Sequence, residues 1–189
     1  ILFSVAADRN CLDSMALAGT GDLKKELLID PKEMVEHNWV LNELRGILGE
    51  FGTVKSSDTY EWKIPPLKHL RTDLSVDLLN RDFSFQEWVE LLHPTPALGV
   101  APHRKNWKWL QELNYSGLQK NHPRRHGAPF AVLSPTGDIK CLVAIRQIQW
   151  HRQNLYMGSG CGIVPESKMH SEWDELILKR QAVAEVFKI

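Results

Sequence analysis

The sequence has few cysteines and no excess of charge of either sign, and both absences exclude classes of protein. Its 189 residues include 3 cysteines at wide spacings, Cys11, Cys141 and Cys161. This pattern fits neither a disulfide framework nor a zinc site, so we expect reduced thiols. The 23 basic residues balance 23 acidic ones. Because a nucleic-acid surface normally carries a basic excess, we expect no nucleic-acid partner.

Long apolar runs are also missing. No run approaches the ~20 residues that a membrane helix needs, and the first residues lack the basic start and long apolar centre of a signal peptide. We therefore expect no membrane partner and a cytoplasmic location. The chain is 43% apolar and 24% charged, as in one folded domain or part of one. It begins with Ile1 inside an apolar segment, which predicts a fragment of a longer domain.

Helix start signals and apolar spacing predict four helices. Asp30 is an N-cap candidate followed by a proline and, three residues after the cap, by Glu33. Ser84 and Glu87 form a second capping box. The predicted helices run from Asp30 to Gly49, from Ser84 to His93, from Pro102 to Asn114 and from Ser171 to Phe187. We expect the helical tryptophans Trp39, Trp88, Trp107 and Trp173 to lie in the core.

The remaining segments predict an antiparallel meander. Strands are expected at 1–5, 59–63, 130–133, 139–150 and 155–157. Residues 14–22 look turn-rich, the rest of 53–81 holds a weakly helical segment, and 115–127 is a polar loop. Helices beside adjacent antiparallel strands, without a βαβ rhythm, indicate an α+β fold in which the meander packs against helices.

Three charged side chains of the closing helix share one face. Glu172, Glu175 and Lys179 stand at positions i, i+3 and i+7, which places them within ~60° of arc on a helix. Two carboxylates one turn apart suit a hard divalent cation such as Mg²⁺. The same pattern fits a solvated face on which Glu175 pairs with Lys179. The pattern alone leaves both interpretations open.

Other polar residues have an ordinary interpretation beside a functional one. Glu36 lies one turn before the apolar Val40, where an exposed carboxylate is common. The glycines of residues 158–162 form either an ordinary turn or a set of backbone N–H groups that receives an anion. Arg146 interrupts an apolar strand and requires a carboxylate, from a ligand or from a structural glutamate. The 8 histidines match no metal motif, so we expect most of them in surface or loop positions.

Six short motifs, taken in order, resemble the C-terminal half of the chorismate-utilising enzymes. They are SMALAGT (14–20), KEMVEH (32–37), LHPTPALG (92–99), VAIR (143–146), GSGCGIVPES (158–167) and SEWDELILK (171–179). Their order and their spread over nearly the whole chain are far more specific than any single motif. The resemblance implies part of that family's fold, with residues 1–189 as a single chorismate-binding domain fragment.

Within this family, LHPTPA and the Glu-Trp pair of the closing helix resemble the isochorismate synthases of menaquinone and siderophore pathways. Anthranilate and aminodeoxychorismate synthases typically carry a segment ending in GAPK at the LHPTPA position, and salicylate synthases also diverge there. The resemblance therefore implies conversion of chorismate to isochorismate. Two alternatives are a synthase component I that uses ammonia to make anthranilate or aminodeoxychorismate, and a non-catalytic chorismate-binding scaffold.

The resemblance also implies roles for residues at matching motif positions. Mg²⁺ would be held by Glu36, Glu172 and Glu175. The substrate, chorismate or isochorismate, would contact Ala18, Gly19, Thr20, His93, Arg146, Gly160, Gly162 and Lys179. Of these, the arginine, the lysine and the two glycine amides of the 158–162 segment resemble the groups that hold the two substrate carboxylates. A neutral protein cannot attract a dianion by its net charge, so local donors and the metal must do so.

The proton-transfer groups of this family have no match in the chain. In such enzymes water adds to one ring carbon as a hydroxyl leaves another, with a lysine as general base and a glutamate as general acid. That lysine lies far upstream of the LAGT motif, and the glutamate would fall at or just before Ile1. We therefore expect a chain that is inactive alone, with exposed sheet edges, and that associates with the missing N-terminal half or with another copy of itself.

Three departures from the family pattern bear on activity. Asn114 stands where the family has a glutamate, and residues 120–127 form a longer loop without a clear motif match. Cys161 replaces a small residue in the glycine segment. A cysteine side chain near the substrate ring would narrow the pocket.

Overall fold

The computed structural model describes the chain except for residues 7–9, 80–82, 102–105, 107, 110–111 and 113–124. Its elements are β1 (Phe3–Ala6), β2 (Cys11–Asp22), α1 (Pro31–Leu48), β3 (Gly52–Ser56), β4 (Tyr60–Ile64), β5 (Leu67–Leu78), α2 (Phe85–Leu92), β6 (Pro129–Leu133), β7 (Ile139–Val143), β8 (Ile148–His151), β9 (Asn154–Met157) and α4 (Met169–Phe187). The predicted helix over 102–114, with Trp107, the predicted loop over 115–127 and the Asn114 departure lie wholly or largely outside the described residues.

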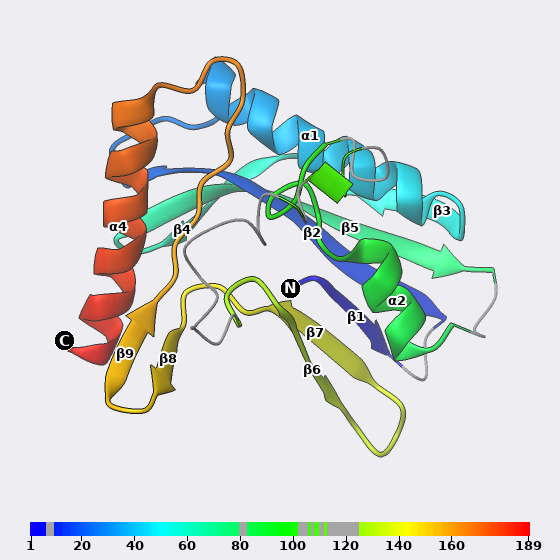
Figure 1. Cartoon of the computed structure of the whole chain (residues 1–189). Helices are drawn as coiled ribbons and strands as arrows, with labels where there is room; N and C mark the ends of the chain where they lie inside the picture. The colour runs from blue at the N-terminus through cyan, green and yellow to red at the C-terminus, as the bar shows by residue number, and fades with distance from the viewer. Residues whose placement is uncertain (7–9, 80–82, 102–105, 107, 110–111, 113–124) are drawn as a thin grey trace.

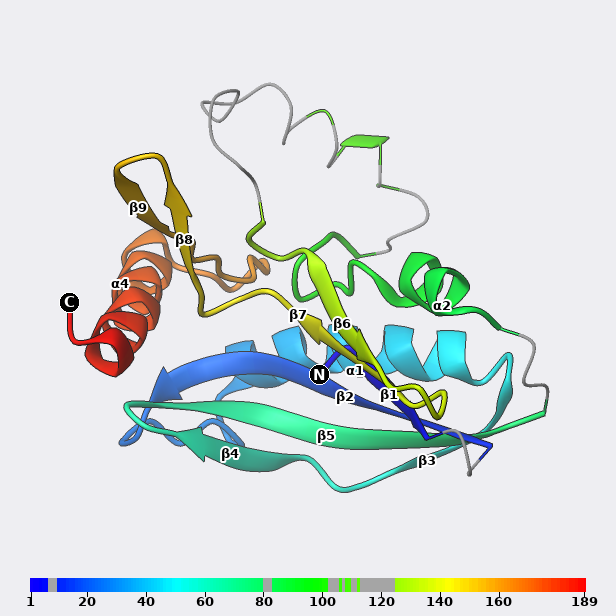
Figure 2. The ribbon, with the colours of Figure 1, turned by 90° about the horizontal axis from the view of Figure 1, so that it is seen from below.

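An antiparallel sheet forms the centre of the molecule (Figure 1). It has 7 strands in the order β3-β5-β2-β1-β7-β6, and β4 pairs with β5 beside β3. The hairpin of β8 and β9 forms a separate sheet of 2 strands, which lies beside α4 in both views (Figures 1 and 2). The predicted α+β fold with an antiparallel sheet is confirmed.

The two longest strands lie where the sequence predicted none. β2 and β5 are 12 residues each and pair along nearly their whole length. The turn-rich stretch predicted over 14–22 is wrong, and so is the weakly helical segment within 53–81. β2 is largely buried at the middle of the sheet, so it lacks the apolar-polar alternation by which a half-exposed strand is recognised. β5 does alternate over residues 70–78, and this signal was present in the sequence.

The strand predicted over 139–150 is also wrong, because it divides into two. β7 pairs with β1 and β6, whereas β8 pairs only with β9 in the part of the chain described. Arg146 lies in the connection between them with a φ of 53°. A positive φ is uncommon for a residue with a side chain, and here the backbone turn carries the chain from one sheet to the other.

The helix α1 begins and ends as predicted. The Asp30 side chain accepts the backbone N–H groups of Lys32 and Glu33, and Gly49 follows its last residue. One face buries apolar side chains that pack on β2 and β5: Val40, Leu41, Leu44 and Leu48. Burial of each such side chain contributes roughly 1.5–3 kcal/mol. This packing fixes the rotation of α1 and therefore the direction of its polar side chains.

The helix α2 carries the one described helical tryptophan that is buried. Its Ser84–Glu87 capping box is present, and Trp88 is 2% exposed and packs edge-on against Phe51. Trp39 and Trp173 are 52% and 60% exposed, so the prediction that they lie in the core is wrong. They lie on faces of their helices that no other described element covers.

The closing helix α4 starts within two residues of the predicted position. Only Glu172 and Val183 of this helix are buried. Its attachment to the rest of the molecule is therefore mostly polar. No described helix is both long and apolar enough to cross a bilayer.

Candidate functional site

Three carboxylates from α1 and α4 converge on the ammonium of Lys32. Its Nζ lies 3.1 Å from Glu36 Oε2, 3.0 Å from Glu172 Oε1 and 4.0 Å from Glu175 Oε2. The three glutamate side chains are only 13%, 7% and 10% exposed. The structure therefore brings Glu36 together with Glu172 and Glu175, which only the family resemblance connected in the sequence. The predicted pair of Glu175 with Lys179 is present, but this face of α4 is largely buried and not solvated.

Burial and opposite charges shift the pKa values in this acidic cluster in different directions. Burial alone would lower the pKa of Lys32, but Glu36 and Glu172 outweigh it and hold the pKa well above 10.5. Burial raises the pKa of Glu175, partly offset by Lys179. Lys32 therefore stays charged at any physiological pH.

A buried carboxylate oxygen in the cluster has no partner. Glu172 is 5% exposed, and its Oε2 has no hydrogen bond within the described chain. An unpaired buried carboxylate oxygen is costly unless a cation or donor reaches it. Carboxylate oxygens of this kind are the ligands that Mg²⁺ prefers, together with waters.

The carboxylates are spaced around an ammonium and not around a metal ion. Among the described residues, no group of three acidic, histidine or cysteine side chains has the arrangement of a finished metal site. Mg²⁺ holds its ligands at about 2.0–2.1 Å, closer than the separations around Lys32. The donor chemistry and the unpartnered oxygen fit a divalent cation, and binding would require the carboxylates to close in as the lysine leaves.

His37 fixes the direction of the neighbouring Glu36. Its ring is 0% exposed, with Nδ1 donating to the Ala18 carbonyl at 3.3 Å and Nε2 accepting from Thr72 Oγ1 at 2.8 Å. Burial lowers the pKa of His37, so the ring is neutral and both nitrogens are used. In the KEMVEH motif, Glu36 therefore belongs to the site, whereas His37 joins α1 to β2 and β5.

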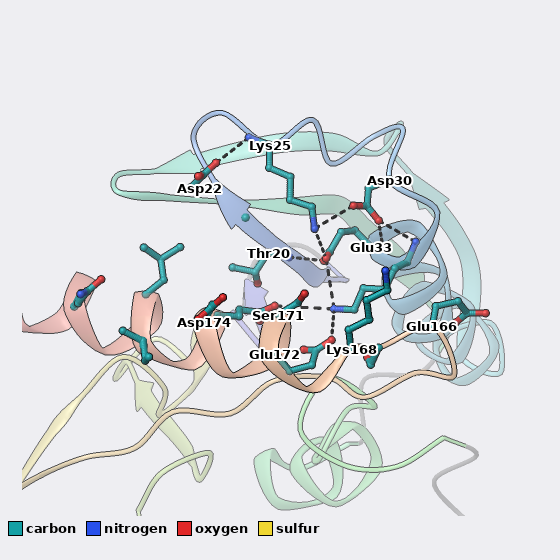
Figure 3. Close-up of a pocket in the computed structure, with 17 residues that line it drawn as sticks. Thr20, Asp22, Lys25, Asp30, Glu33, Glu166, Lys168, Ser171, Glu172 and Asp174 are labelled. Atoms are coloured by element: carbon teal, nitrogen blue, oxygen red, sulfur yellow. Dashed lines mark hydrogen bonds and ion pairs between the residues drawn. The ribbon is translucent and has the colours of Figure 1, made fainter.

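The LAGT motif forms a bulge in β2 that receives a glutamate of α1. Gly19 has a φ of +79°, and a Cβ there would lie 3.2 Å from the Glu33 carbonyl. The strand register shifts between Ala18 and Thr20. The Thr20 N–H donates to Glu33 Oε2 at 2.9 Å, and Lys25 Nζ donates to Glu33 Oε1 at 2.6 Å. Figure 3 shows Lys25 reaching Glu33 and Asp30 at this place.

The guanidinium of Arg146 lies between His69 of β5 and the backbone of α4 at Lys179. It donates to the Lys179 carbonyl at 3.2 Å and lies 3.4 Å from His69 Nε2. A guanidinium only donates, so Nε2 accepts and Nδ1–H donates to Thr20 Oγ1 at 3.0 Å. Burial, with the charges of Arg146 and Lys179, lowers the pKa of His69 to about 4.

This arrangement leaves the Arg146 guanidinium without a structural glutamate. No carboxylate of the described residues lies within ion-pair distance of it. Of the two interpretations of Arg146 that the sequence left open, the structural ion pair is therefore wrong for the described chain. A partly buried guanidinium with free donors suits a carboxylate ligand.

The glycine segment is held between α4 and Glu36. Lys179 Nζ donates to the Gly160 carbonyl at 2.8 Å and to Glu175 Oε1 at 2.5 Å. A Cβ at Gly162 would lie 2.5 Å from Glu36 Oε1, whereas a Cβ at Gly160 would meet no atom within 4 Å. Gly162 is therefore required for close approach of the carboxylate, and Gly160 borders open space.

Two further residues border this segment. Burial, with Glu172 and Glu175 nearby, raises the pKa of the Cys161 thiol, so the thiol stays protonated. His93 caps α2, and its Nε2 donates to the Gly127 carbonyl at 2.7 Å. The structure thus places the predicted pocket residue His93 in a contact with the backbone before β6.

The sequence model of the chorismate binding enzymes matches residues 2–185. The chain belongs to this family. Among curated relatives, this chorismate binding enzyme is 30% identical to the isochorismate synthase MenF of Bacillus subtilis over 159 residues, which are 82% of the chain and 32% of that protein. It is 29% identical over 182 residues to the salicylate biosynthesis isochorismate synthase of Pseudomonas aeruginosa, with 90% and 37% covered.

Other members of the family are also similar. The chain is 27% identical to anthranilate synthase component 1 of Acetivibrio thermocellus over 165 residues, which are 85% of the chain and 32% of that protein. A crystal structure assigned as the 2,3-dihydroxybenzoate-specific isochorismate synthase DhbC of Bacillus anthracis superposes with a TM-score of 0.83 at 24% identity, over 99% of this chain and 52% of that one. The chain thus spans about a third of the length of the curated relatives it matches.

Three residues that organise the candidate site were not predicted from the sequence. Lys32 and Glu33 look like ordinary first-turn charges, and His69 lies in a strand that was not predicted. The signal that was present is the KEMVEH motif itself, because its lysine stands four residues before Glu36 and therefore on the same helix face.

Proposed function

We propose that this chorismate binding enzyme domain converts chorismate to isochorismate with Mg²⁺ as part of an isochorismate synthase. The observation that carries the proposal is that Glu36 from α1 and Glu172 and Glu175 from α4 converge on the ammonium of Lys32. The Arg146 guanidinium and Lys179 lie at the same part of α4. A ring compound with two carboxylates would therefore meet both the acidic side chains that would hold the metal and the basic side chains of Arg146 and Lys179.

Each group has a defined task in this proposal. Glu36, Glu172 and Glu175 would hold Mg²⁺, which fixes and neutralises the ring carboxylate of the substrate. The substrate carboxylates would accept hydrogen bonds from Arg146, Lys179 and the N–H groups of Gly160 and Gly162. His69, kept neutral by burial and by the nearby positive charges, would orient the guanidinium.

The chain supplies no residue matching the family's general base and general acid. We propose that both groups come from outside these 189 residues, from the region that the relatives carry beyond the match or from a second copy of the chain. A location in the cytoplasm, where chorismate-consuming biosynthesis would take place, belongs to the same proposal.

The test is product identification with the active full-length polypeptide. Incubation with chorismate and Mg²⁺ should give isochorismate, and addition of ammonia should leave the product unchanged. An aminated ring product formed with ammonia would instead support the second candidate, an anthranilate or aminodeoxychorismate synthase. That candidate is favoured by the 27% identity to an anthranilate synthase component.

A third candidate is a chorismate-binding scaffold without catalysis, and binding measurements distinguish it from the two enzymes. Calorimetric titration of the chain with Mg²⁺ and chorismate should show that each ligand strengthens binding of the other. Chorismate binding that is indifferent to Mg²⁺, in a full-length polypeptide without turnover, would favour the scaffold.

A further inference from the structure

Lys32 occupies the position at which the acidic side chains of two helices meet. Besides the contacts with Glu36, Glu172 and Glu175, its Nζ lies 3.4 Å from Glu33 Oε1. The lysine side chain itself is only 16% exposed. Lys32 therefore places a positive charge among carboxylates that would otherwise repel one another in a poorly solvated place. Two of these carboxylates have a second lysine, because Lys25 also pairs with Glu33 and Lys179 with Glu175.

The neutralisation is incomplete. The three carboxylates of Glu36, Glu172 and Glu175 face two ammonium groups, those of Lys32 and Lys179. Glu172 Oε2 is buried and has no hydrogen-bond partner among the described residues. A lysine offers three donors and one charge, whereas a divalent cation offers two charges and reaches more oxygens. The cluster is thus organised for a cation of higher charge than the one it holds.

Lys32 also has space into which to withdraw. An open pocket of about 660 Å³ lies next to it. It is lined by Lys25, Asp30 and Glu33 as well as by Glu172 and Glu175, and Figure 3 shows Glu33 and Glu172 on opposite sides of it. Glu33 remains available as a partner for the ammonium after it leaves Glu172, because Glu33 already lies within ion-pair distance.

We propose that Lys32 is a resident cation that holds the site together without metal and is displaced toward Glu33 when a divalent cation binds Glu36, Glu172 and Glu175. This inference rests on the Mg²⁺ site of the proposed function. Lys32 is then a positioning residue that sets the metal affinity and keeps α4 docked before metal arrives.

The first experiment measures Mn²⁺ and Mg²⁺ affinity of the wild-type chain and of Lys32→Met by calorimetry, together with the melting temperature without metal. Removal of the competing charge should raise metal affinity on the order of tenfold and should lower the melting temperature of the metal-free chain. Lys32→Arg, which keeps the charge, should not raise the affinity. Lys63→Met, at an exposed lysine of β4, is the matched control and should change neither quantity.

The outcomes separate the two claims. Equal or weaker metal binding by Lys32→Met overturns the competition, because a purely structural lysine would lower stability and metal affinity together. Absence of divalent cation binding by both wild type and Lys32→Met overturns the competition and the Mg²⁺ site alike.

A second measurement needs no variant. The wild-type chain is treated with an amine-acylating reagent with and without Mg²⁺, and labelling of each lysine is followed by mass spectrometry. Displacement from the carboxylates should make Lys32 react several-fold faster with Mg²⁺, relative to Lys63. An unchanged relative rate, under conditions where calorimetry detects bound Mg²⁺, would overturn the displacement.

Discussion

Glu175 lies between two lysines, with Oε1 2.5 Å from Lys179 Nζ and Oε2 4.0 Å from Lys32 Nζ. In the active full-length polypeptide, Glu175→Gln should raise the Mg²⁺ concentration for half-maximal turnover by about 10- to 100-fold, because a ligand charge is lost while the shape is kept. The measurement is a Mg²⁺ titration of initial rate. The neighbouring Asp174→Asn, at an exposed position of the same helix, should behave as wild type. An unchanged Mg²⁺ dependence in Glu175→Gln would remove Glu175 from the metal site.

The carboxylate of Glu36 lies so close to Gly162 that a side chain at this position would disturb it. Gly162→Ala introduces a Cβ 2.5 Å from Glu36 Oε1, so the carboxylate must move and Mn²⁺ affinity should fall on the order of tenfold. Calorimetry of the chain measures this. Gly46→Ala, where a Cβ meets no atom within 4 Å, should leave the affinity unchanged. Equal affinities in the two variants would show that Glu36 does not bind the metal from this position.

His69 makes stability depend on pH. Its pKa is about 4 in the folded chain and near 6.5 in the unfolded chain, so the unfolded state binds the extra proton first as the pH falls. The contribution of His69 to the free energy of unfolding is present above pH 6.5 and is lost between pH 6.5 and 4, by up to about 3 kcal/mol. Urea unfolding at a series of pH values should show this slope. His69→Gln should flatten it only partly, because burial also lowers the pKa of His37. An identical slope in the variant would contradict the shift.

At the scale of elements, α1 and α4 differ in how they are attached. α1 buries four apolar side chains against the sheet, whereas Val183 is the one fully buried apolar side chain of α4. Half-buried apolar side chains such as Leu176 and polar contacts of Lys179 and Arg180 with the glycine segment add to its attachment. Helices with few buried apolar contacts open locally at low cost. The acidic cluster is therefore built between a rigid helix and a loosely held one.

Hydrogen exchange tests this difference. Backbone amides of α4 should exchange on the order of tenfold or more faster than those in the middle of α1, and saturating Mg²⁺ should slow exchange in α4 because the metal joins the helices. Mass spectrometry of peptides from the two helices measures both effects. Equal protection of the two helices without metal would mean that the polar contacts hold α4 as firmly as an apolar face.

The elements that the sequence predicted well are those with local start and stop signals. Asp30 with its proline, Gly49 and the Ser84–Glu87 box act within a few residues, so α1 and α2 were placed within one residue of their positions. α4, which has no side-chain cap, was still placed within two residues. β2 was missed because its burial comes from distant parts of the chain. β5 was missed although its apolar-polar alternation over residues 70–78 is a local signal. Small residues such as Ala16, Ala18 and Gly19 resemble a turn until two strands and a helix are packed around them.

The candidate site was predicted in part for the same reason. The spacing of Glu172, Glu175 and Lys179 shows one helix face, and the ordered motifs connect it to Glu36. Nothing local indicates that Lys32 reaches across to α4, that Glu33 enters the bulge of β2, or that Arg146 faces His69. These contacts depend on the register of the sheet, which no local sequence pattern specifies.

At the scale of the whole molecule, the sheet as described ends at β6 with apolar side chains in solvent. Phe130 and Val132 are 60% and 62% exposed, and β6 pairs only with β7 among the described strands. Exposed apolar edge strands are sites of pairing with further chain. The superposed isochorismate synthase structure is about twice as long as the matched part, and we propose that this further half covers the edge.

Co-purification tests this arrangement. The chain co-expressed with the remaining half of the full-length polypeptide should form a complex that turns over chorismate, while the chain alone should not. Val132→Lys should prevent the complex, since a charge would be buried at the edge. Leu79→Lys, at a position that is 85% exposed and away from β6, is the control and should leave the complex intact. Turnover by the chain alone would refute the need for the second half.

The acidic residues of the site lie near opposite ends of the chain, on α1 and on α4. During synthesis on the ribosome, Glu36 emerges early, and its partners Glu172 and Glu175 emerge only when the last helix leaves the exit tunnel. In the proposed site, therefore, the three carboxylates can hold an ion together only after residue 175 has emerged. A protein truncated before Glu172 would keep the sheet strands and α1 and would be expected to lose its affinity for the ion.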